Sequence, residues 1–335
     1  MTINNTSRAL RLSIPSKGRL SESAQELLEA CDLKIYKPNP RQYIASIPNL
    51  PGLQVLFQRA GDIVVGVRDG SVDFGITGRD IVEEKRGENG DIIILHDRLG
   101  FGYCDLMLAI PEDLPIESNA DLIDYAKQQT NPLRIATKFP NLTTRYLTKH
   151  AMPHTLVYAE GTLENAPTIG YADMIADLVS SGQTLRDNRL RPIPDAVIQA
   201  SEACLVANRK TLETNPDALA IAVQLLEAIE AHQRANENMM VTANIRGETP
   251  DQVAEKVFEQ PTIRGLQGPT ISEVYVHNDT ANWFSVQIIV HRDQLLRAIC
   301  ELRAIGGSGV IVSPVTYIFE EEPARVRDLL ARINA

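Results

Sequence analysis

The chain has few cysteines and no long hydrophobic run, and each scarcity excludes a class of protein. Its 335 residues include four cysteines, which lie far apart: Cys31, Cys104, Cys204 and Cys300. This spacing excludes a disulfide-rich scaffold and a Cys-x-x-Cys centre, and it is typical of thiols kept reduced in a cytosol. No apolar run approaches the roughly 18 residues of a membrane-spanning helix. We therefore expect a soluble, cytoplasmic protein with no membrane partner.

Basic residues are also fewer than acidic residues. The sequence holds 33 basic and 43 acidic residues, for a net charge of −10. This balance argues against a nucleic acid partner, because phosphate backbones require clustered Lys and Arg. The six histidines show no HxH or HExxH spacing, so we expect no dedicated metal site. An anionic ligand must then find local positive potential in an acidic protein.

Short β-type runs alternate with helical runs from Leu10 to about Val206, which is typical of parallel α/β layers. A change of composition near Tyr103 indicates a second α/β lobe, and Ala203 to Ala207 reads as a strand that returns to the first. Two lobes joined by two crossings enclose a cleft, where small molecules usually bind. The predicted parts are a flexible arm at 1–8, a first lobe at 9–105 with 195–235, a second lobe at 106–194, an appended unit at 236–320 and a tail at 321–335.

The appended unit follows a long amphipathic helix from Pro216 to Asn238. Its order of secondary-structure elements differs from that of the lobes: we expect a strand, a helix, two strands, a helix and a strand. The predicted elements are 239–245, 250–258, 271–277, 283–290, 293–305 and 310–315. This βαββαβ order predicts a small ferredoxin-like domain of regulatory or assembly function.

The segment from Ala166 to Leu185 has the strongest chemical pattern. Asp173 and Asp177 are four residues apart, so on a helix they share one face. We expect that helix to stop at Ser180-Ser181-Gly182, where small side chains leave backbone N–H groups exposed, and Thr184 to cap the helix that follows. A phosphorylated sugar fits such a site, with its hydroxyls on the acids and its phosphate on the amides. The alternative is an amphipathic helix with a Gly stop and two solvated acids.

Two further strand-to-helix turns are places where open α/β sheets bind ligands. The first, Pro15 to Arg19, follows a strand at 10–14 and carries Lys17 and Arg19, which suit a phosphate chain. The second runs from Val72 to Asp80. It predicts a buried strand, a Gly-Ile-Thr-Gly bend and a helix that begins at Thr77 or Asp80.

Three segments in this order resemble the ATP phosphoribosyltransferase family: Ile14 to Leu20, Asp73 to Asp80 and Ala172 to Leu185. Gly268 to Ile271 and Leu302 to Val312 are similar to the C-terminal domain of the family's long form. The resemblance implies two catalytic lobes with the fold of periplasmic binding proteins. It also implies the first step of histidine biosynthesis, feedback inhibition by histidine at the appended domain, and assembly into dimers and hexamers.

In the implied reaction, adenine N1 of ATP attacks the anomeric carbon of phosphoribosyl pyrophosphate and releases pyrophosphate, which carries the Mg²⁺. The resemblance assigns catalysis to Asp173 and Asp177. It assigns phosphoribosyl pyrophosphate to Glu160, Ser180, Ser181, Gly182, Gln183 and Thr184. It assigns ATP to Lys17, Gly18, Arg19, Arg59, Asp73, Gly75, Thr77 and Gly78, and histidine to Asn244, Thr270, Ser308 and Gly309.

Two other functions stay open at this point. A two-lobed sensor that binds a small molecule without chemistry has the same layout, although it has no need of an acid pair joined to a Ser-Ser-Gly-Gln-Thr loop. A phosphoribosyltransferase that uses another base also fits these motifs.

Overall fold

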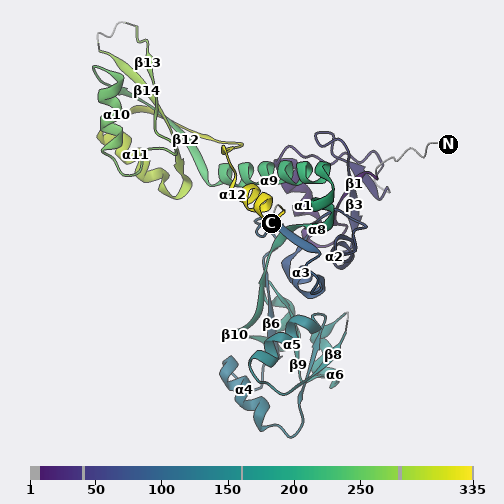
Figure 1. The fold of residues 1–335 in the computed structure, drawn as a ribbon. Coiled ribbons are helices and arrows are strands. Elements are labelled where there is room, and N and C mark those ends of the chain that lie inside the picture. The colour runs from purple at the N-terminus through teal and green to yellow at the C-terminus, as the bar shows by residue number, and fades with distance from the viewer. Residues whose placement is uncertain (1–7, 40–41, 160, 278–280, 334–335) are drawn as a thin grey trace, which may run out of the picture. The chain divides into compact units, whose positions relative to one another are not determined.

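The computed structural model describes residues 8–39, 42–159, 161–277 and 281–333. The chain divides into two compact units, Met1–Leu226 with Asp328–Ala335, and Glu227–Arg327. The first unit contains two separate sheets and the second contains one (Figure 1).

The first part of the large unit, lobe I, is built on a six-stranded sheet in the order β2-β3-β1-β4-β11-β5. Its strands are β1 (Leu10–Pro15), β2 (Ile44–Ser46), β3 (Leu53–Gln58), β4 (Phe74–Gly78), β5 (Ile92–His96) and β11 (Ala203–Asn208). β1, β3 and β4 are parallel, and β11 is antiparallel to both of its neighbours. The helices are α1 (Arg19–Ala30), α2 (Ala60–Arg68) and α3 (Arg79–Lys85).

The Gly-Ile-Thr-Gly bend predicted in lobe I is wrong. All four residues belong to β4, which is buried along its whole length, and α3 begins directly after Gly78. Gly75 is needed for packing, because a Cβ there would lie 2.5 Å from Cγ2 of Ile63 on α2. The small side chain therefore lets helix α2 approach the sheet.

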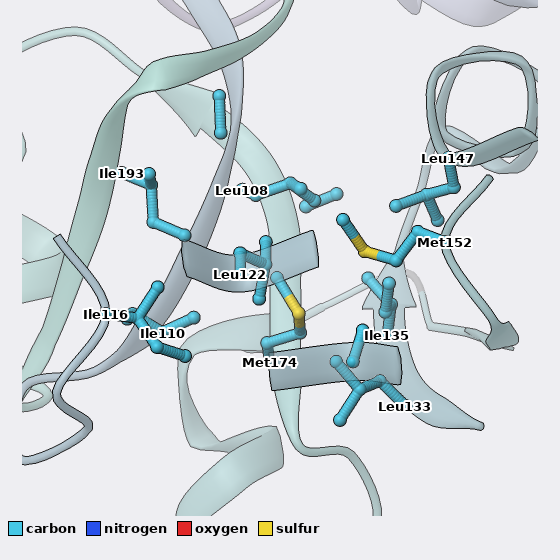
Figure 2. Close-up of a cluster of buried hydrophobic side chains, with 13 residues drawn as sticks. Leu108, Ile110, Ile116, Leu122, Leu133, Ile135, Leu147, Met152, Met174 and Ile193 are labelled. Carbon is cyan, nitrogen blue, oxygen red and sulfur yellow. The ribbon is translucent and has the colours of Figure 1, made fainter. Parts of the chain in front are cut away.

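The second part of the large unit, lobe II, has a five-stranded sheet in the order β10-β6-β9-β7-β8. Its strands are β6 (Cys104–Pro111), β7 (Leu133–Thr137), β8 (His154–Tyr158), β9 (Met174–Val179) and β10 (Leu190–Ser201). Its helical elements are α4 (Asn119–Gln128), α5 (Pro140–Lys149), η1 (Leu163–Asn165), α6 (Ala166–Ile169) and α7 (Gln183–Asp187). Figure 2 shows its core, where Leu108, Leu122, Ile135 and Met174 meet between the sheet and α4.

The chain crosses between the lobes twice, as predicted, but the boundary expected after residue 194 is wrong, because β10 stays paired with β6 as far as Ser201. It leaves lobe I between β5 and β6 and returns between β10 and β11. α8 (Arg209–Thr214) and α9 (Pro216–Asn236) then follow. Both sheets are mixed: β11 lies between β4 and β5 in the lobe I sheet and is antiparallel to both, and β10 forms an antiparallel edge strand of the lobe II sheet.

The second unit confirms the predicted ferredoxin-like order. β12 (Asn238–Arg246), α10 (Pro250–Phe258), β13 (Thr270–Val274), β14 (Trp283–His291), η2 (Arg292–Gln294), α11 (Leu295–Ala304) and β15 (Ser308–Pro314) follow one another, and the sheet order is β13-β14-β12-β15. Val241, Phe284 and Val286 are buried in its core cluster. The predicted tail contains one more helix, α12 (Ala324–Ile333).

Candidate active site

In lobe II, the carboxyl ends of three parallel strands lie at one edge of the sheet. β7 pairs in parallel with both β8 and β9, so the residues that follow Thr137, Tyr158 and Val179 come together. This is the edge where open α/β sheets bind their ligands. The turn after β9 contains the predicted phosphate loop.

The helix predicted across Asp173 and Asp177 is wrong, because this segment forms strand β9. Met174, Ile175 and Ala176 are buried between β6 and β7, and such a run suits a central strand. Along a strand, four residues span about 13 Å. The two aspartates therefore lie at opposite ends of β9.

The loop after β9 keeps the features of an anion site. Gly182 has φ +69°, a left-handed conformation that favours glycine. Ser180 and Thr184 are exposed, and the Ser181 hydroxyl accepts a hydrogen bond from the Gln183 N–H (3.3 Å). Thr184 does not cap α7 as predicted, because the helix begins at Gln183 and Gly182 is its N-cap.

Asp177 lies at the loop end of β9 and is mostly buried, with 15% of its side chain exposed. The Lys138 ammonium is 4.0 Å from Asp177 Oδ1. Burial raises the pKa of the Asp177 carboxyl, while the nearby Lys138 charge acts to lower it and Glu164 acts to raise it. Asp177 is thus a desolvated carboxylate with one close cation. Glu160 lies outside the described residues.

Sequence reasoning missed Lys138, although it directly follows a correctly predicted strand at 133–137. The Thr137 hydroxyl holds this turn in place: it donates to the Ala176 carbonyl (2.9 Å) and accepts from the Phe139 N–H (3.0 Å). Arg186 was also missed, and its guanidinium donates to the Ser181 carbonyl (3.1 Å). The strand-end rule that singled out Lys17 would also have found Lys138.

Asp173 directly precedes β9, at the amino end of the strand, and its carboxylate accepts hydrogen bonds from Arg134. Arg134 Nη2 donates to Oδ1 (2.7 Å) and the Arg134 backbone N–H donates to Oδ2 (2.8 Å). These hydrogen bonds lower the pKa of the Asp173 carboxyl. Asp173 lines a cavity of about 1210 Å³ at this far edge of lobe II. The prediction that Asp173 and Asp177 act as one pair on a helix face is therefore wrong.

Lobe I presents basic residues at the carboxyl ends of its parallel strands. Lys17 and Gly18 follow β1, Arg59 follows β3, and all three are exposed. Gly18 has φ +79° and open space around its Cα, so only the backbone conformation demands glycine there. Arg19 begins α1 and donates to the Tyr103 carbonyl (3.1 Å).

Three residues that were assigned to ATP have other contacts. Asp73 is buried at the opposite edge of the sheet, where it accepts hydrogen bonds from Arg8 and from the Arg11 backbone (both 2.8 Å). Thr77 is fully buried, and its hydroxyl faces the Ala60 carbonyl at 3.4 Å. Gly75 packs against α2. Of the four residues of this motif that were assigned to ATP, only Gly78 lies at the carboxyl end of β4.

Comparisons with known proteins decide the family. Residues 59–231 match the family model described as HisG: ATP phosphoribosyltransferase, and residues 235–317 match the HisG C-terminal domain. ATP phosphoribosyltransferase 2, chloroplastic, of Arabidopsis thaliana is 45% identical over 97% of this chain and 81% of its own length. The chain belongs to the ATP phosphoribosyltransferase family.

Other relatives agree. An ATP phosphoribosyltransferase of Gemmatimonas aurantiaca is 34% identical over 91% of this chain and 98% of its own. Among solved structures, a chain of the ATP phosphoribosyltransferase HisG:HisZ complex of Thermotoga maritima matches with a TM-score of 0.52 and 25% identity, covering 66% of this chain and 98% of that one. The match to the C-terminal domain model identifies this chain as the long form of the family.

The C-terminal domain of this ATP phosphoribosyltransferase brings together three of the four residues predicted for histidine. Asn244 of β12 is paired with Ser308 of β15, whose hydroxyl donates to the Asn244 carbonyl (3.4 Å). A Cβ at Gly309 would lie 4.0 Å from Asn244 Nδ2. Thr270 lies on β13, two strands from β12, so it is not brought to the same place.

No group of three or more His, Cys, Asp and Glu side chains in the described part of the chain is arranged to hold a metal ion. Within the same residues, no helix combines the length and apolar character needed to cross a bilayer.

Proposed function

We propose that lobe II of this ATP phosphoribosyltransferase binds phosphoribosyl pyrophosphate and that lobe I binds ATP. The observation that carries the proposal is the turn after β9, where a desolvated Asp177 with its Lys138 partner precedes an exposed small-residue loop. Ser180, Ser181, Gly182, Gln183 and Thr184 hold the 5-phosphate through backbone N–H groups and hydroxyls. Asp177 accepts hydrogen bonds from the ribose hydroxyls.

The reaction needs electrostatic stabilisation more than a nucleophile from the protein. Adenine N1 forms a bond to the anomeric carbon while the bond from that carbon to the pyrophosphate oxygen breaks, and pyrophosphate leaves with the electron pair. Positive charge develops on the ribose ring in the transition state, so a fixed carboxylate beside the ring stabilises it. Asp177 supplies that charge only when ionised, and Lys138 favours the ionised form.

Mg²⁺ enters as part of the substrate, bound to the pyrophosphate oxygens. This ion prefers phosphate oxygens and water, and it needs few protein ligands. The donor set in lobe II fits that role, since Asp177 is a single carboxylate beside an exposed loop.

ATP binds at the edge of lobe I, with its phosphates near Lys17, Gly18, Arg19 and Arg59. Those basic residues supply local positive potential in an acidic protein. Asp73, Gly75 and Thr77 support the sheet beneath this site, and Gly78 ends the strand at its edge.

A direct assay separates this activity from binding without chemistry. The protein is mixed with ATP, Mg²⁺ and phosphoribosyl pyrophosphate, and pyrophosphate release is followed with an added pyrophosphatase. Release that requires both substrates is expected, and no release supports a two-lobed sensor. Replacing ATP with other nucleotides or free bases tests whether another base is used.

The C-terminal domain implies histidine as feedback inhibitor, and Asn244, Ser308 and Gly309 are the proposed contacts. Asn244→Ala is expected to raise the histidine concentration needed for half inhibition, with turnover unchanged. Thr270→Ala is the comparison within the same sheet, because Thr270 lies two strands away. An equal loss of inhibition in both variants places Thr270 in the pocket after all.

Assembly and location are further proposals. A homo-oligomer, as dimer and hexamer, is tested by light scattering with and without histidine. A cytoplasmic location stays a prediction, because the two Arabidopsis thaliana relatives are named as chloroplastic proteins.

A further inference from the structure

Helix α3 of lobe I carries two buried carboxyl groups that contact lobe II. Asp80 and Glu84 are 3% and 6% exposed, and they lie one helical turn apart on the same face. Asp80 Oδ1 accepts a hydrogen bond from the Ser201 hydroxyl (2.6 Å), at the end of the crossing strand β10. Glu84 reaches further into lobe II, to the start of α5.

Glu84 caps α5 from outside its own lobe. The first N–H groups of a helix have no partner within the helix, and the N-cap residue of α5, Phe139, provides no side-chain cap. Glu84 Oε1 accepts from the Asn141 N–H and Oε2 from the Leu142 N–H, each at 2.9 Å. The Asn141 amide in turn donates to the Glu84 carbonyl (3.0 Å). A carboxylate is also the favoured charge at a helix N-terminus.

An apolar contact lies beside this cap. Ile81 of α3 packs against the buried cluster of Leu106, Phe139 and Leu142, and Leu178 packs against the same cluster. Phe139 directly follows Lys138, and Leu178 directly follows Asp177. Helix α3 therefore supports both chain segments that carry the proposed ion pair of the phosphoribosyl site, and α3 itself begins where β4 ends at the ATP edge.

We propose that Glu84 is a positioning residue that holds the two lobes at the separation the reaction needs. It fixes the Lys138–Asp177 pair of lobe II relative to the ATP edge of lobe I, so that adenine N1 meets the anomeric carbon. This inference rests on the proposed assignment of one substrate to each lobe. Each substrate binds its own lobe without help from Glu84, but the transfer step requires the two lobes to be held at the correct relative position.

The test compares Glu84→Gln with Glu83→Gln in the full chain. Glu83 is the neighbouring acid on α3, and its carboxylate pairs with Arg79 and Arg86 inside lobe I. In Glu84→Gln, one α5 N–H meets an amide N–H₂ instead of an oxygen. We expect kcat to fall roughly ten- to hundredfold, because small misplacements of reacting groups cost that much. The Kd of ATP and the Kd of phosphoribosyl pyrophosphate, each titrated alone by calorimetry, are expected to change less than about twofold.

Glu83→Gln is expected to keep kcat within about twofold of the wild type. Asn141→Ala removes the returning hydrogen bond without touching the carboxylate, and it is expected to lower kcat by a smaller factor in the same direction. A Glu84→Gln enzyme with wild-type kcat overturns the inference. So does an equal loss of kcat in Glu83→Gln, or a loss that appears in the Kd of either substrate alone.

Failure of the underlying function has a different outcome. If wild type releases no pyrophosphate, or if Asp177→Asn is as active as wild type, the proposed site is wrong and Glu84 is not the cause. If wild type is active and Asp177→Asn is not, the Glu84 variants test this inference alone.

Discussion

The two lobes share one hydrogen-bond arrangement between an aspartate and an arginine at the amino ends of their central strands, but the pKa of the aspartate shifts in opposite directions. Asp73 precedes β4 and Asp173 precedes β9. In lobe I the Arg11 N–H donates to Asp73 Oδ2, and in lobe II the Arg134 N–H donates to Asp173 Oδ2, both at 2.8 Å. In return, each aspartate N–H donates to the carbonyl of the same arginine, at 3.0 and 2.8 Å.

The difference lies in burial. Asp73 is 1% exposed, and desolvation raises the pKa of its carboxyl despite the Arg8 ion pair. Asp173 has 38% of its side chain exposed, and its hydrogen bonds with Arg134 lower the pKa of its carboxyl. The same backbone geometry thus accompanies opposite pKa shifts, because removal of the Asp73 charge from water outweighs its favourable contacts, whereas the more exposed Asp173 loses less hydration than its hydrogen bonds with Arg134 return.

The comparison also separates structure from function within each lobe. The aspartates at the amino ends join neighbouring strands, whereas Lys17, Lys138 and Asp177 lie at or near the carboxyl ends, on the edge proposed to bind the substrates. The predictions below test this division.

The largest effect is expected from Asp177→Asn. This change removes the carboxylate at the loop end of β9 while leaving its shape, so we expect kcat to fall by about 100-fold or more. Steady-state pyrophosphate release measures it, and the melting temperature serves as the control for folding. Near-normal turnover would mean that the carboxyl end of β9 has no catalytic role, so the proposed assignment of structure to one end and function to the other would be wrong.

Asp73→Asn is expected to be the most destabilising change at the amino ends. The buried amide N–H₂ then faces the Arg8 guanidinium, so we expect a loss of about 1–3 kcal/mol in the free energy of unfolding. The pKa of Asp73 is raised in the fold, so the native state binds its proton more tightly than the unfolded chain. The loss measured by urea unfolding should therefore shrink as pH rises through the folded pKa.

Lys138→Met changes the pH dependence of turnover. Lys138 acts to lower the pKa of Asp177, so its removal raises that pKa further. The acid limb of kcat/KM should then move to higher pH, and the variant should lose more activity at about pH 5 than at about pH 8. An acid limb identical to that of wild type would show that another group controls it.

Asp173→Asn is expected to have the smallest effect. The pair with Arg134 is partly exposed, and we expect a loss of about 1 kcal/mol or less in stability, with turnover within about twofold of wild type. The pKa of Asp173 is lowered in the fold, so its contribution is present above pH ~4 and disappears as pH falls through the folded pKa. Urea unfolding at neutral and acid pH measures this, and its trend is opposite to that of Asp73→Asn.

Much of the fold followed from local pattern. The strand at 133–137 and the helix at 250–258 are correct to the residue. Thr249 caps the helix and Pro250 begins it, so its start carries a clear local signal. The spacing of Asp173 and Asp177 was misleading, since four residues return to one face on a helix and also on a strand. Pairing with β6 and β7 selects the strand, and no local signal reports those partners.

By itself, the sequence determined the α/β class, the βαββαβ order of the appended unit and the family, because these depend on local patterns and motifs along the chain. Only the tertiary structure decided which acids lie near the carboxyl ends of strands and which join neighbouring strands at their amino ends. Asp73, Asp173 and Glu84 have partners 39 to 65 positions away. Burial and hydrogen bonding between residues so far apart in the sequence depend on how sheets and helices pack. The same residue type therefore joins two strands at one end of a sheet and is a proposed ribose ligand at the other.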